Sequence, residues 1–555
     1  MTRISDANDI RSRFSKARQR FAKDERGAVL VFALFLFIVM IMMGGLAVDL
    51  MRYEATRTTL QNTLDRSTLA AASLSQTLDP EDVVRDYFAK AGMTQDLQSV
   101  TVSEGLNYRN VAARAAADAD PLFLHMIGVD EFIAPGASTA EQRVTNLEIS
   151  LVLDVSGSMG GAKLANLKIA AKEFVDTVLS SDPDGRIAIS IVPYNAQVNL
   201  GPVLRAKYAV THDHGVADAN CIEIPAANYG TVGLSNTTPM PMMAHADISF
   251  STNKVTTHTA PSDTTYATAN YSSVHCKLTT GNIVRLPSQS ISDLKTQIDG
   301  LVASGNTSIM AGMRWGVSLL DPEARPMFTS LIAEGAMAPE LADRPYDYGN
   351  EEVLKIVVLM TDGEHVSHTF VKDAFKTGAS PIYKSTGDGN YSVFHSARSG
   401  NKYWVPHLST WQAAAYNSGS GVVQQDWKHI WSNLRATYVA WNFYARATGT
   451  SSSTRNTIYD SKMNEIRGTF TSVSTMNSQL QQSCAAAKTK SIIVYGIAFA
   501  APANGQQQIK SCTTGYNAAD PNGSNAYYFA PVADESISDA FRTIATNISQ
   551  LRLTQ

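Results

Sequence analysis

Five side chains with oxygen donors, found at three places in the chain, could together hold a hard metal ion. The first place is the run Asp154-Val155-Ser156-Gly157-Ser158, in which two hydroxyls follow a carboxylate at intervals of two residues. Thr307 and Asp362 mark the other two places. Ligand sets made only of oxygen suit hard divalent cations, Mg²⁺ in particular. We therefore expect a site for Mg²⁺, or for another divalent cation such as Mn²⁺ or Ca²⁺, at Asp154, Ser156, Ser158, Thr307 and Asp362.

The surrounding sequence predicts elements that bring these side chains together. Residues 147–154 and 355–361 are rich in Leu and β-branched residues, as buried strands are, and each run ends at or beside one of the two carboxylates. Thr307 lies shortly before a helical pattern at 309–320. In a doubly wound sheet, the loops at the carboxyl ends of the strands meet at one crevice, where ligands bind. The three places should therefore share that crevice.

The rest of the body repeats this alternation of strands and helices. Further strands are expected at 186–194 and 491–499. Helical patterns occupy 162–179, 291–301, 309–320, 476–488 and 535–551. Strands that alternate with helices of this length predict an α/β fold with a doubly wound, mostly parallel, Rossmann-like sheet.

Two stretches interrupt the alternation and are predicted to be large loop insertions. Residues 204–286 are rich in Ser, Thr, Asn and Tyr, and residues 365–470 hold five of the six Trp. Aromatic side chains from Trp427 to Trp441 recur at helical spacing, which favours one buried helix over a recognition surface. Because loops often carry function, ligand specificity could lie in these insertions.

The metal-site residues resemble the metal-ion-dependent adhesion site of von Willebrand factor type A domains, in which Asp-x-Ser-x-Ser, Thr and Asp-Gly occur in this order. The resemblance implies that the three hydroxyls bind the ion directly or through water, and that Asp154 and Asp362 act mainly through water. It also implies a protein partner whose Asp or Glu completes the coordination. The one departure is Gly-Asn before Thr307, where many members have Gly-Gly.

These residues allow two other interpretations. Asp-x-Ser-x-Ser is also typical of a capped turn before a helix, because Ser and Asp are favoured caps. An enzyme is disfavoured, because no nucleophile, base and orienting group converge. Ser158 does not form a Gly-x-Ser-x-Gly nucleophile elbow, because Ser156 stands where glycine is needed. The pairs His212/His214 and His365/His368 lack further zinc ligands at suitable spacing. We expect a non-enzymatic protein.

A membrane segment is predicted at residues 28–48, which are 21 residues without a charge. Residues 1–27 carry eight basic and four acidic groups, which gives this tail a net charge of +4. Because the whole chain has a net charge of −4, the residues after the tail have a net charge of −8. The positive-inside rule then keeps the tail cytoplasmic and exports the body. A cleaved signal peptide is the alternative. The acidic body argues against a nucleic-acid partner.

The helix is expected to continue beyond the membrane, because no Gly or Pro occurs between residues 46 and 79. A spacer is favoured over a packing face for a partner helix.

The four cysteines all lie in the exported part, which fits two disulfides in an oxidising compartment. Three connectivities are open, and the local one, Cys221–Cys276 with Cys484–Cys512, is favoured.

Both ends of the chain resemble TadG-like pilus-assembly proteins of the Tad (Flp) pilus. The resemblance rests on Arg-Gly-Ala-Val-Leu-Val-Phe from residue 26, Asp-Leu at 49–50, Leu-Gln-Asn-Thr-Leu-Asp at 60–65, and the closing stretch from Tyr527 to Gln555. Arg66 and Thr68 depart from it, since smaller residues are expected there. The resemblance implies a single-pass protein of the bacterial inner membrane, with a periplasmic body and other Tad pilus components as partners.

Two further alternatives remain beside this one. A prepilin-like subunit would carry Glu at the fifth position after a cut at Gly27, where Phe32 stands. A membrane-anchored surface adhesin, or a matrix-binding von Willebrand factor A protein not tied to pili, would share the metal site.

The predicted organisation is a basic tail at 1–27, the membrane helix at 28–48, a juxtamembrane helix and small domain at 49–145, and the von Willebrand factor type A domain at 146–555.

Overall fold

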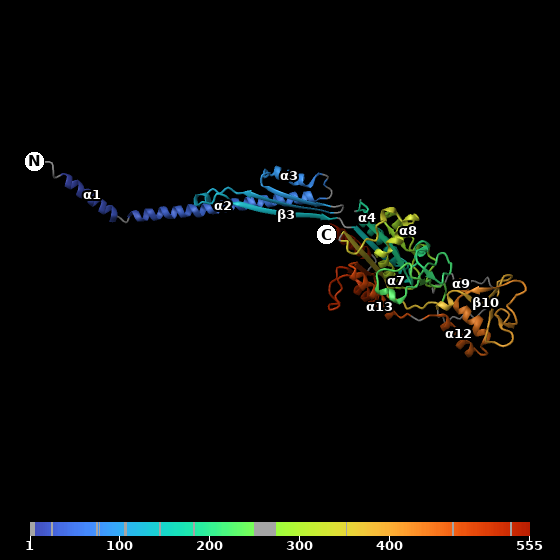
Figure 1. Ribbon diagram of the computed structural model, residues 1–555. Coiled ribbons are helices and arrows are strands. Elements are labelled where there is room, and N and C mark those ends of the chain that lie inside the picture. The colour runs from blue at the N-terminus through green and yellow to red at the C-terminus, as the bar shows by residue number, and fades with distance from the viewer. Residues whose placement is uncertain are drawn as a thin grey trace. The chain divides into compact units, whose positions relative to one another are not determined.

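The computed structural model describes residues 6–23, 26–73, 76, 78–104, 108–143, 146–180, 182, 184–248, 274–350, 352–468, 471–532 and 536–554 (Figure 1). The chain divides into two compact units. The first comprises residues 1–144 with 553–555, and the second comprises residues 145–552.

The first unit combines helices with a small antiparallel sheet. Its helices are α1 (Asp6–Lys23), α2 (Arg26–Ala72) and α3 (Pro80–Lys90). The strands β1 (Leu97–Glu104), β2 (Tyr108–Asp118) and β3 (Ile133–Arg143) pair in that order. A short 3₁₀ turn, η1 (Leu124–Ile127), lies in the loop between β2 and β3.

Helix α2 changes character along its length. Its N-terminal half is apolar, almost wholly exposed, and long enough to cross a membrane. Its C-terminal half buries Leu60 and Leu64 completely in a core shared with β2, β3 and α3. The helix therefore does continue past the apolar run, but it is more than a spacer, because it packs on the chain's own sheet.

The second unit is built on a six-stranded sheet of order β16-β15-β9-β4-β5-β8. All neighbours pair in parallel except β5 with β8. The strands are β4 (Asn146–Asp154), β5 (Ile187–Tyr194), β8 (Arg285–Ser288), β9 (Val353–Thr361), β15 (Ile493–Ala498) and β16 (Tyr528–Phe529). The predicted doubly wound, mostly parallel α/β fold is confirmed.

Helices cover both faces of this sheet because successive strand residues point to opposite faces. Val152 belongs to the core under one face, and Leu151 and Leu153 belong to the core under the other. The first face is covered by α7 (Ile309–Ser318), α8 (Arg325–Ala333), α13 (Val473–Thr489) and α14 (Ala503–Cys512). The second is covered by α4 (Ala162–Ser180), α6 (Ile291–Asp299) and α15 (Ser536–Thr554).

Residues 371–466 form a substructure around a separate core, which also includes Ala246 and Ile248. Its elements β10 and α12 are labelled in Figure 1. Its sheet has the order β13-β12-β11-β10-β14. The strands are β10 (Ala379–Ser385), β11 (Tyr391–Phe394), β12 (Tyr403–Val405), β13 (Thr410–Gln412) and β14 (Val422–Asp426). The helices are α9 (Trp427–Asn433), α10 (Ala436–Tyr438), the π-helix η9 (Val439–Ala445), α11 (Arg446–Thr448) and α12 (Ser452–Ile466).

The aromatic stripe from Trp427 to Trp441 does not form the single helix expected. Leu434 has extended backbone and separates α9 from α10. The stripe is nevertheless mostly core, because Trp427, Trp431 and Tyr438 are buried.

The stretch 204–286 is largely irregular where the structure describes it. It begins in the last turn of α5 (Gly201–Arg205). It contains β6 (Val210–Thr211), β7 (Met240–Pro241) and the 3₁₀ turns η3 (Ala226–Gly230) and η5 (Thr280–Asn282). The part from 249 to 273 lies outside the described residues. The buried Arg314 of α7 anchors the stretch by donating to the carbonyls of Asn228 and Val232.

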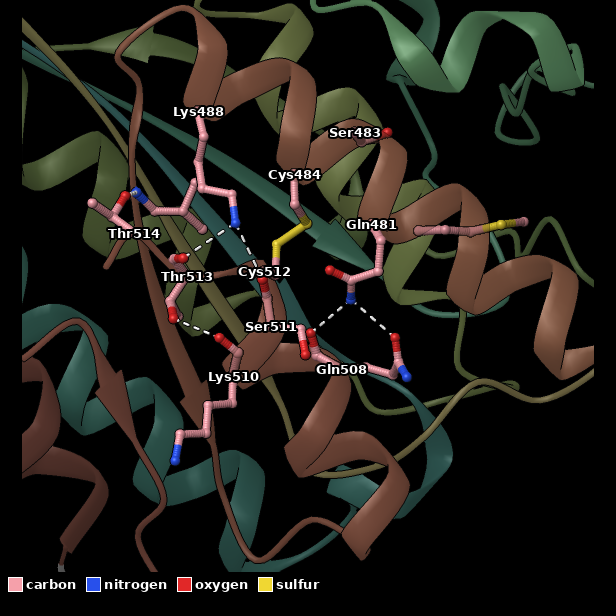
Figure 2. The surroundings of a disulfide bond; sticks show 12 residues. Gln481, Ser483, Cys484, Lys488, Gln508, Lys510, Ser511, Cys512, Thr513 and Thr514 are labelled. Atoms are coloured by element: carbon pink, nitrogen blue, oxygen red, sulfur yellow. Dashed lines mark hydrogen bonds between the residues drawn. A yellow bond between two sulfur atoms is a disulfide. The ribbon is translucent and has the colours of Figure 1, made fainter. Parts of the chain in front are cut away.

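The four cysteines form two disulfides with the local connectivity, Cys221–Cys276 and Cys484–Cys512. The second joins α13 to α14 on the first face of the main sheet (Figure 2). Beside it, Gln481 donates to Gln508 and Lys488 donates to the carbonyls of Ser511 and Thr513, so polar contacts between the two helices accompany the covalent link.

Candidate metal centre

Asp154 is the last residue of β4, and Asp362 directly follows β9. These two strands are adjacent, at the point where the strand order reverses. From β4 the chain continues to β5 on one side, whereas β9 lies on the other side of β4. Leu153 is in register with Met360, so β4 and β9 end side by side. This is the switch point at which open α/β sheets bind ligands.

The Asp154 carboxylate is fully buried and held by two hydrogen bonds. Its Oδ1 accepts from the backbone N–H of Ser156 at 2.8 Å, which closes the turn after β4. Its Oδ2 accepts from the hydroxyl of Thr361 at 2.7 Å. Both oxygens are therefore fixed before any ligand arrives.

The two serines link this turn to Asp362. The Oγ atoms of Ser156 and Ser158 lie 3.0 Å apart, and the Ser158 hydroxyl donates to Oδ1 of Asp362 at 2.6 Å. Ser156 and Asp362 are buried, whereas Ser158 is exposed. The group thus reaches solvent at Ser158.

Thr307 reaches the same group through backbone contacts between the loops. The N–H of Gly157 donates to the carbonyl of Gly305 at 2.9 Å, and the N–H of Val366 donates to the carbonyl of Thr307 at 2.9 Å. A Cβ built on Gly363 would lie 3.5 Å from Oγ1 of Thr307 and 3.8 Å from Oγ of Ser158. The five predicted side chains therefore lie in adjoining loops that these contacts link.

His365 holds the loop that carries Thr307 in place, a role that its local sequence does not indicate. Its Nε2 accepts from the N–H of Met310 at 2.9 Å, so it caps α7, the helix that follows Thr307. Its Nδ1 therefore donates to Oδ1 of Asn477 at 2.7 Å. Burial lowers the pKa of His365 to about 4, which keeps the ring neutral and able to accept.

Lys163 is a second residue whose role at the site the sequence does not indicate. Its Nζ lies 2.7 Å from Oδ2 of Asp362, so the two atoms of that carboxylate contact a hydroxyl and an ammonium. Lys163 is in the first turn of α4, nine residues after Asp154 in the sequence. A cation of the chain itself thus neutralises one of the two carboxylates.

The electrostatics of the site set the charge of Asp154. Burial and the neighbouring Asp362 raise the pKa of Asp154 to about 6, although hydrogen bonds from Ser156 and Thr361 oppose the shift. Burial also raises the pKa of Tyr194, which stays a phenol and donates to the carbonyl of Met360 at 2.9 Å. The site favours an added positive charge.

The donors present fit a hard divalent cation. Two carboxylates and three hydroxyls supply oxygen alone, the set that Mg²⁺ prefers. Beside Thr307, the buried hydroxyls of Ser304 and Ser308 have no hydrogen-bond partner in the part of the chain that the structure describes. Among the described residues there is no group of three or more His, Cys, Asp or Glu that could hold a metal, so any site here depends on hydroxyls.

The remaining members of the two histidine pairs, His212, His214 and His368, are buried or packed against other side chains. Nδ1 of His212 lies 2.9 Å from the hydroxyl of Thr377. His214 and His368 are buried, and burial lowers the pKa of His214 to about 4 and that of His368 to about 3. His368 stacks on Phe370 with ring centroids 4.6 Å apart.

Comparison with protein families matches residues 27–74 to the model described as putative Flp pilus-assembly TadE/G-like. The match thus covers the apolar half of α2 and its continuation. No curated protein matches the chain.

Several solved structures are distantly similar. The pilus adhesin SpaC from Lactobacillus rhamnosus GG, in its open conformation, is 10% identical, with a TM-score of 0.26, over 82% of this chain and 34% of SpaC. The PilB minor pilin from Streptococcus sanguinis is 12% identical, with a TM-score of 0.28, over 82% of this chain and 78% of PilB. The pilus adhesin RrgA from Streptococcus pneumoniae is 10% identical, with a TM-score of 0.28, over 81% of this chain and 49% of RrgA.

Proposed function

We propose that this chain is a non-enzymatic, membrane-anchored component of Tad (Flp) pilus assembly, and that its body binds a protein partner through a divalent cation. The family match at residues 27–74 supports the pilus association, and the exposed apolar helix supports the anchor. The observation that carries the binding role is the convergence of Asp154, Ser156, Ser158, Thr307 and Asp362 at the switch point of the sheet.

Mg²⁺ at this point would be held by the five oxygen donors, and it would supply an electrophilic centre for an Asp or Glu of the partner. The chain's own part is to position the donors. The turn after β4 fixes Asp154, and His365 fixes the loop that carries Thr307. Exposed Ser158 lies where the partner would approach.

The membrane arrangement in this proposal is a single inner-membrane span with the N-terminus in the cytoplasm and the body in the periplasm. The basic residues before the span favour that orientation, and the two disulfides suit an oxidising compartment. A reporter that is active only in the periplasm should be active when fused after residue 100. Activity of a cytoplasm-only reporter at the same point would reverse the orientation.

The metal is tested by calorimetry on the full-length protein in detergent. Asp154→Ala should abolish Mg²⁺ binding and leave the circular dichroism spectrum unchanged. Asp299→Ala is the matched control, because Asp299 is an exposed carboxylate paired with Lys172 outside the site. Unchanged Mg²⁺ affinity in Asp154→Ala would remove the basis of the proposal.

The partner is tested by pull-down from membranes in Mg²⁺ and in chelator. Capture by the wild type should fall in chelator to the level of Asp154→Ala in Mg²⁺. Deletion of the gene should abolish pili. Pili that persist after deletion, together with Mg²⁺-dependent capture, would indicate an adhesin instead of an assembly component.

A further inference from the structure

The loop between β2 and β3 has an apolar tip. Residues 121–129 read Pro-Leu-Phe-Leu-His-Met-Ile-Gly-Val, and acidic residues flank them on both sides. Within the tip, Leu122, Met126 and Ile127 are 59%, 74% and 57% exposed. Three large apolar side chains on one short loop form an exposed patch of the kind that marks an interaction site.

Asp49 fixes this tip to α2. Its carboxylate accepts the backbone N–H groups of Leu122, Phe123 and Leu124 at 2.9, 2.8 and 2.7 Å. Asp49 is almost fully buried by these contacts. The residue directly after the predicted membrane segment thus holds the loop against the helix, and the loop's position along α2 is set.

The adjacent glycines Gly44 and Gly45 of α2 differ in the space available for a side chain. A Cβ on Gly45 would lie 2.6 Å from Cβ of Phe123, so the loop approaches the helix at a distance that only glycine permits. A Cβ on Gly44 would meet nothing within 4 Å. Beside Phe123, residues 39–46 of α2 and residues 123–127 line an apolar groove of about 290 Å³.

The groove lies at the depth of the apolar run. Residues 39–46 belong to the uncharged segment 28–48, and at 1.5 Å per residue the distance from Asp49 back to Val39 along the helix is about 15 Å. A loop beside those residues is at hydrocarbon depth whenever the segment spans a bilayer of about 30 Å.

The backbone of the tip is suited to that environment, where unpaired N–H groups are costly. Asp49 takes three of them, Met126 N–H donates to the Phe123 carbonyl, and Gly128 N–H donates to the His125 carbonyl. The one ionisable side chain of the tip, His125, has Nδ1 2.8 Å from the carboxylate of Asp130 at its edge.

We propose that residues 121–129 insert into the lipid bilayer beside α2, and that phospholipid acyl chains fill the groove between them. The chain would then hold the membrane with a helix and a clamped loop, which fixes the rotation of α2 about its axis relative to the membrane surface. The proposal goes beyond metal-dependent binding and rests on the proposed membrane anchor.

The test uses single introduced thiols, because the four native cysteines are all in disulfides. Full-length Met126→Cys and Ile127→Cys are labelled with an environment-sensitive fluorophore and reconstituted in phosphatidylcholine vesicles with and without brominated acyl chains. Met42→Cys, in the apolar run, is the control for insertion of α2. Leu78→Cys, an exposed position of the same unit, is the water control.

Brominated lipid should quench labels at 126 and 127 at least twofold, as at 42, and leave position 78 unquenched. Quenching at 42 without quenching at 126 and 127 overturns the loop insertion and leaves the anchor standing. Absence of quenching at 42 overturns both. A label at 126 that is protected from water-soluble reagents but not quenched shows that protein covers the tip, which also overturns the proposal.

The glycine pair tests whether α2 sets the depth of the tip. In the Met126→Cys background, Gly45→Leu should displace Phe123 and reduce quenching at 126 to the level of position 78. Gly44→Leu adds the same side chain one residue away and should leave quenching intact. Equal quenching in the two variants would contradict the seating of the tip on α2.

Discussion

Replacing Asp154 with Asn should stabilise the metal-free protein at neutral pH. Asn keeps the shape of the side chain, so its oxygen still accepts from the Ser156 N–H and its amide reaches the Thr361 hydroxyl. It removes a charge that is fully buried and lies near Asp362. An uncompensated buried charge is costly, so its removal is a gain when no cation is present.

The size of the gain follows from the pKa of Asp154, which is raised from 3.8 to about 6. Below pH 3.8 the carboxyl is protonated in both the folded and the unfolded chain and costs nothing. Between pH 3.8 and 6 the unfolded chain loses this proton first, so the folded state loses stability as the pH rises. Above pH 6 the full cost is about 3 kcal/mol. The advantage of Asp154→Asn in chelator should therefore grow from near zero at pH 4 to about 1–3 kcal/mol at pH 7.5.

The assay is urea unfolding of the full-length protein in detergent, followed by tryptophan fluorescence. All six Trp lie in the second unit, so the signal reports on the unit that carries the site. Mg²⁺ at 100 times its dissociation constant should stabilise the wild type by about 2.7 kcal/mol and the variant not at all, which closes the difference. Asp299→Asn is the control for loss of an exposed carboxylate. A variant less stable than wild type in chelator at pH 7.5, or a difference independent of pH, would refute the reasoning.

Three further predictions concern Lys163, Gly505 and the disulfide between α13 and α14. Lys163→Met removes the ammonium beside Asp362, so calorimetry should find Mg²⁺ binding about tenfold tighter, and unchanged or weaker binding would contradict a competing role. Gly505→Ala would place a Cβ over the carbonyl oxygen of Gly363 and should weaken Mg²⁺ binding more than tenfold, whereas Gly349→Ala, whose Cβ meets nothing within 4 Å, should not. Replacing both Cys484 and Cys512 with Ser should lower the free energy of unfolding by about 3–4 kcal/mol in the chain-entropy model and leave Mg²⁺ affinity unchanged. Free thiols at these two positions in peptide mapping of the wild type would rule out the disulfide.

The main sheet could be predicted because its strands are buried on both faces. Such strands are continuous apolar runs, and the sequence indicates β4, β9 and β15 to within two residues. The same reasoning does not reveal β2, whose Ala-rich run has little β propensity. The structure explains its composition, because α2 lies close to this sheet. A Cβ on Gly136 of the neighbouring β3 would lie 2.7 Å from Cδ1 of Leu64, so small residues are needed there.

The placement of the five proposed donors could be predicted because each lies at the end or start of a recognisable element, whereas their binding of a metal stays a prediction. The roles of Lys163 and His365 could not be predicted, because they depend on partners far away in the sequence. Lys163 contacts Asp362, and His365 contacts Met310 and Asn477. Neither residue has a local sequence context that indicates its role, and only the tertiary fold brings each one next to its partners.

Lys163 also explains how two carboxylates can share a buried crevice without a metal. Its ammonium neutralises Asp362, and the raised pKa of Asp154 lets that carboxyl take a proton near pH 6, so the crevice without an added cation approaches electrical balance. A divalent cation bound as proposed would have to displace the ammonium from Oδ2 of Asp362 and compete with the proton on Asp154. Both exchanges would weaken binding of the cation, and only the exchange with the proton would depend on pH in this range. Mg²⁺ affinity should therefore rise between pH 5 and pH 7 in the wild type and in Lys163→Met alike, with the variant tighter at each pH.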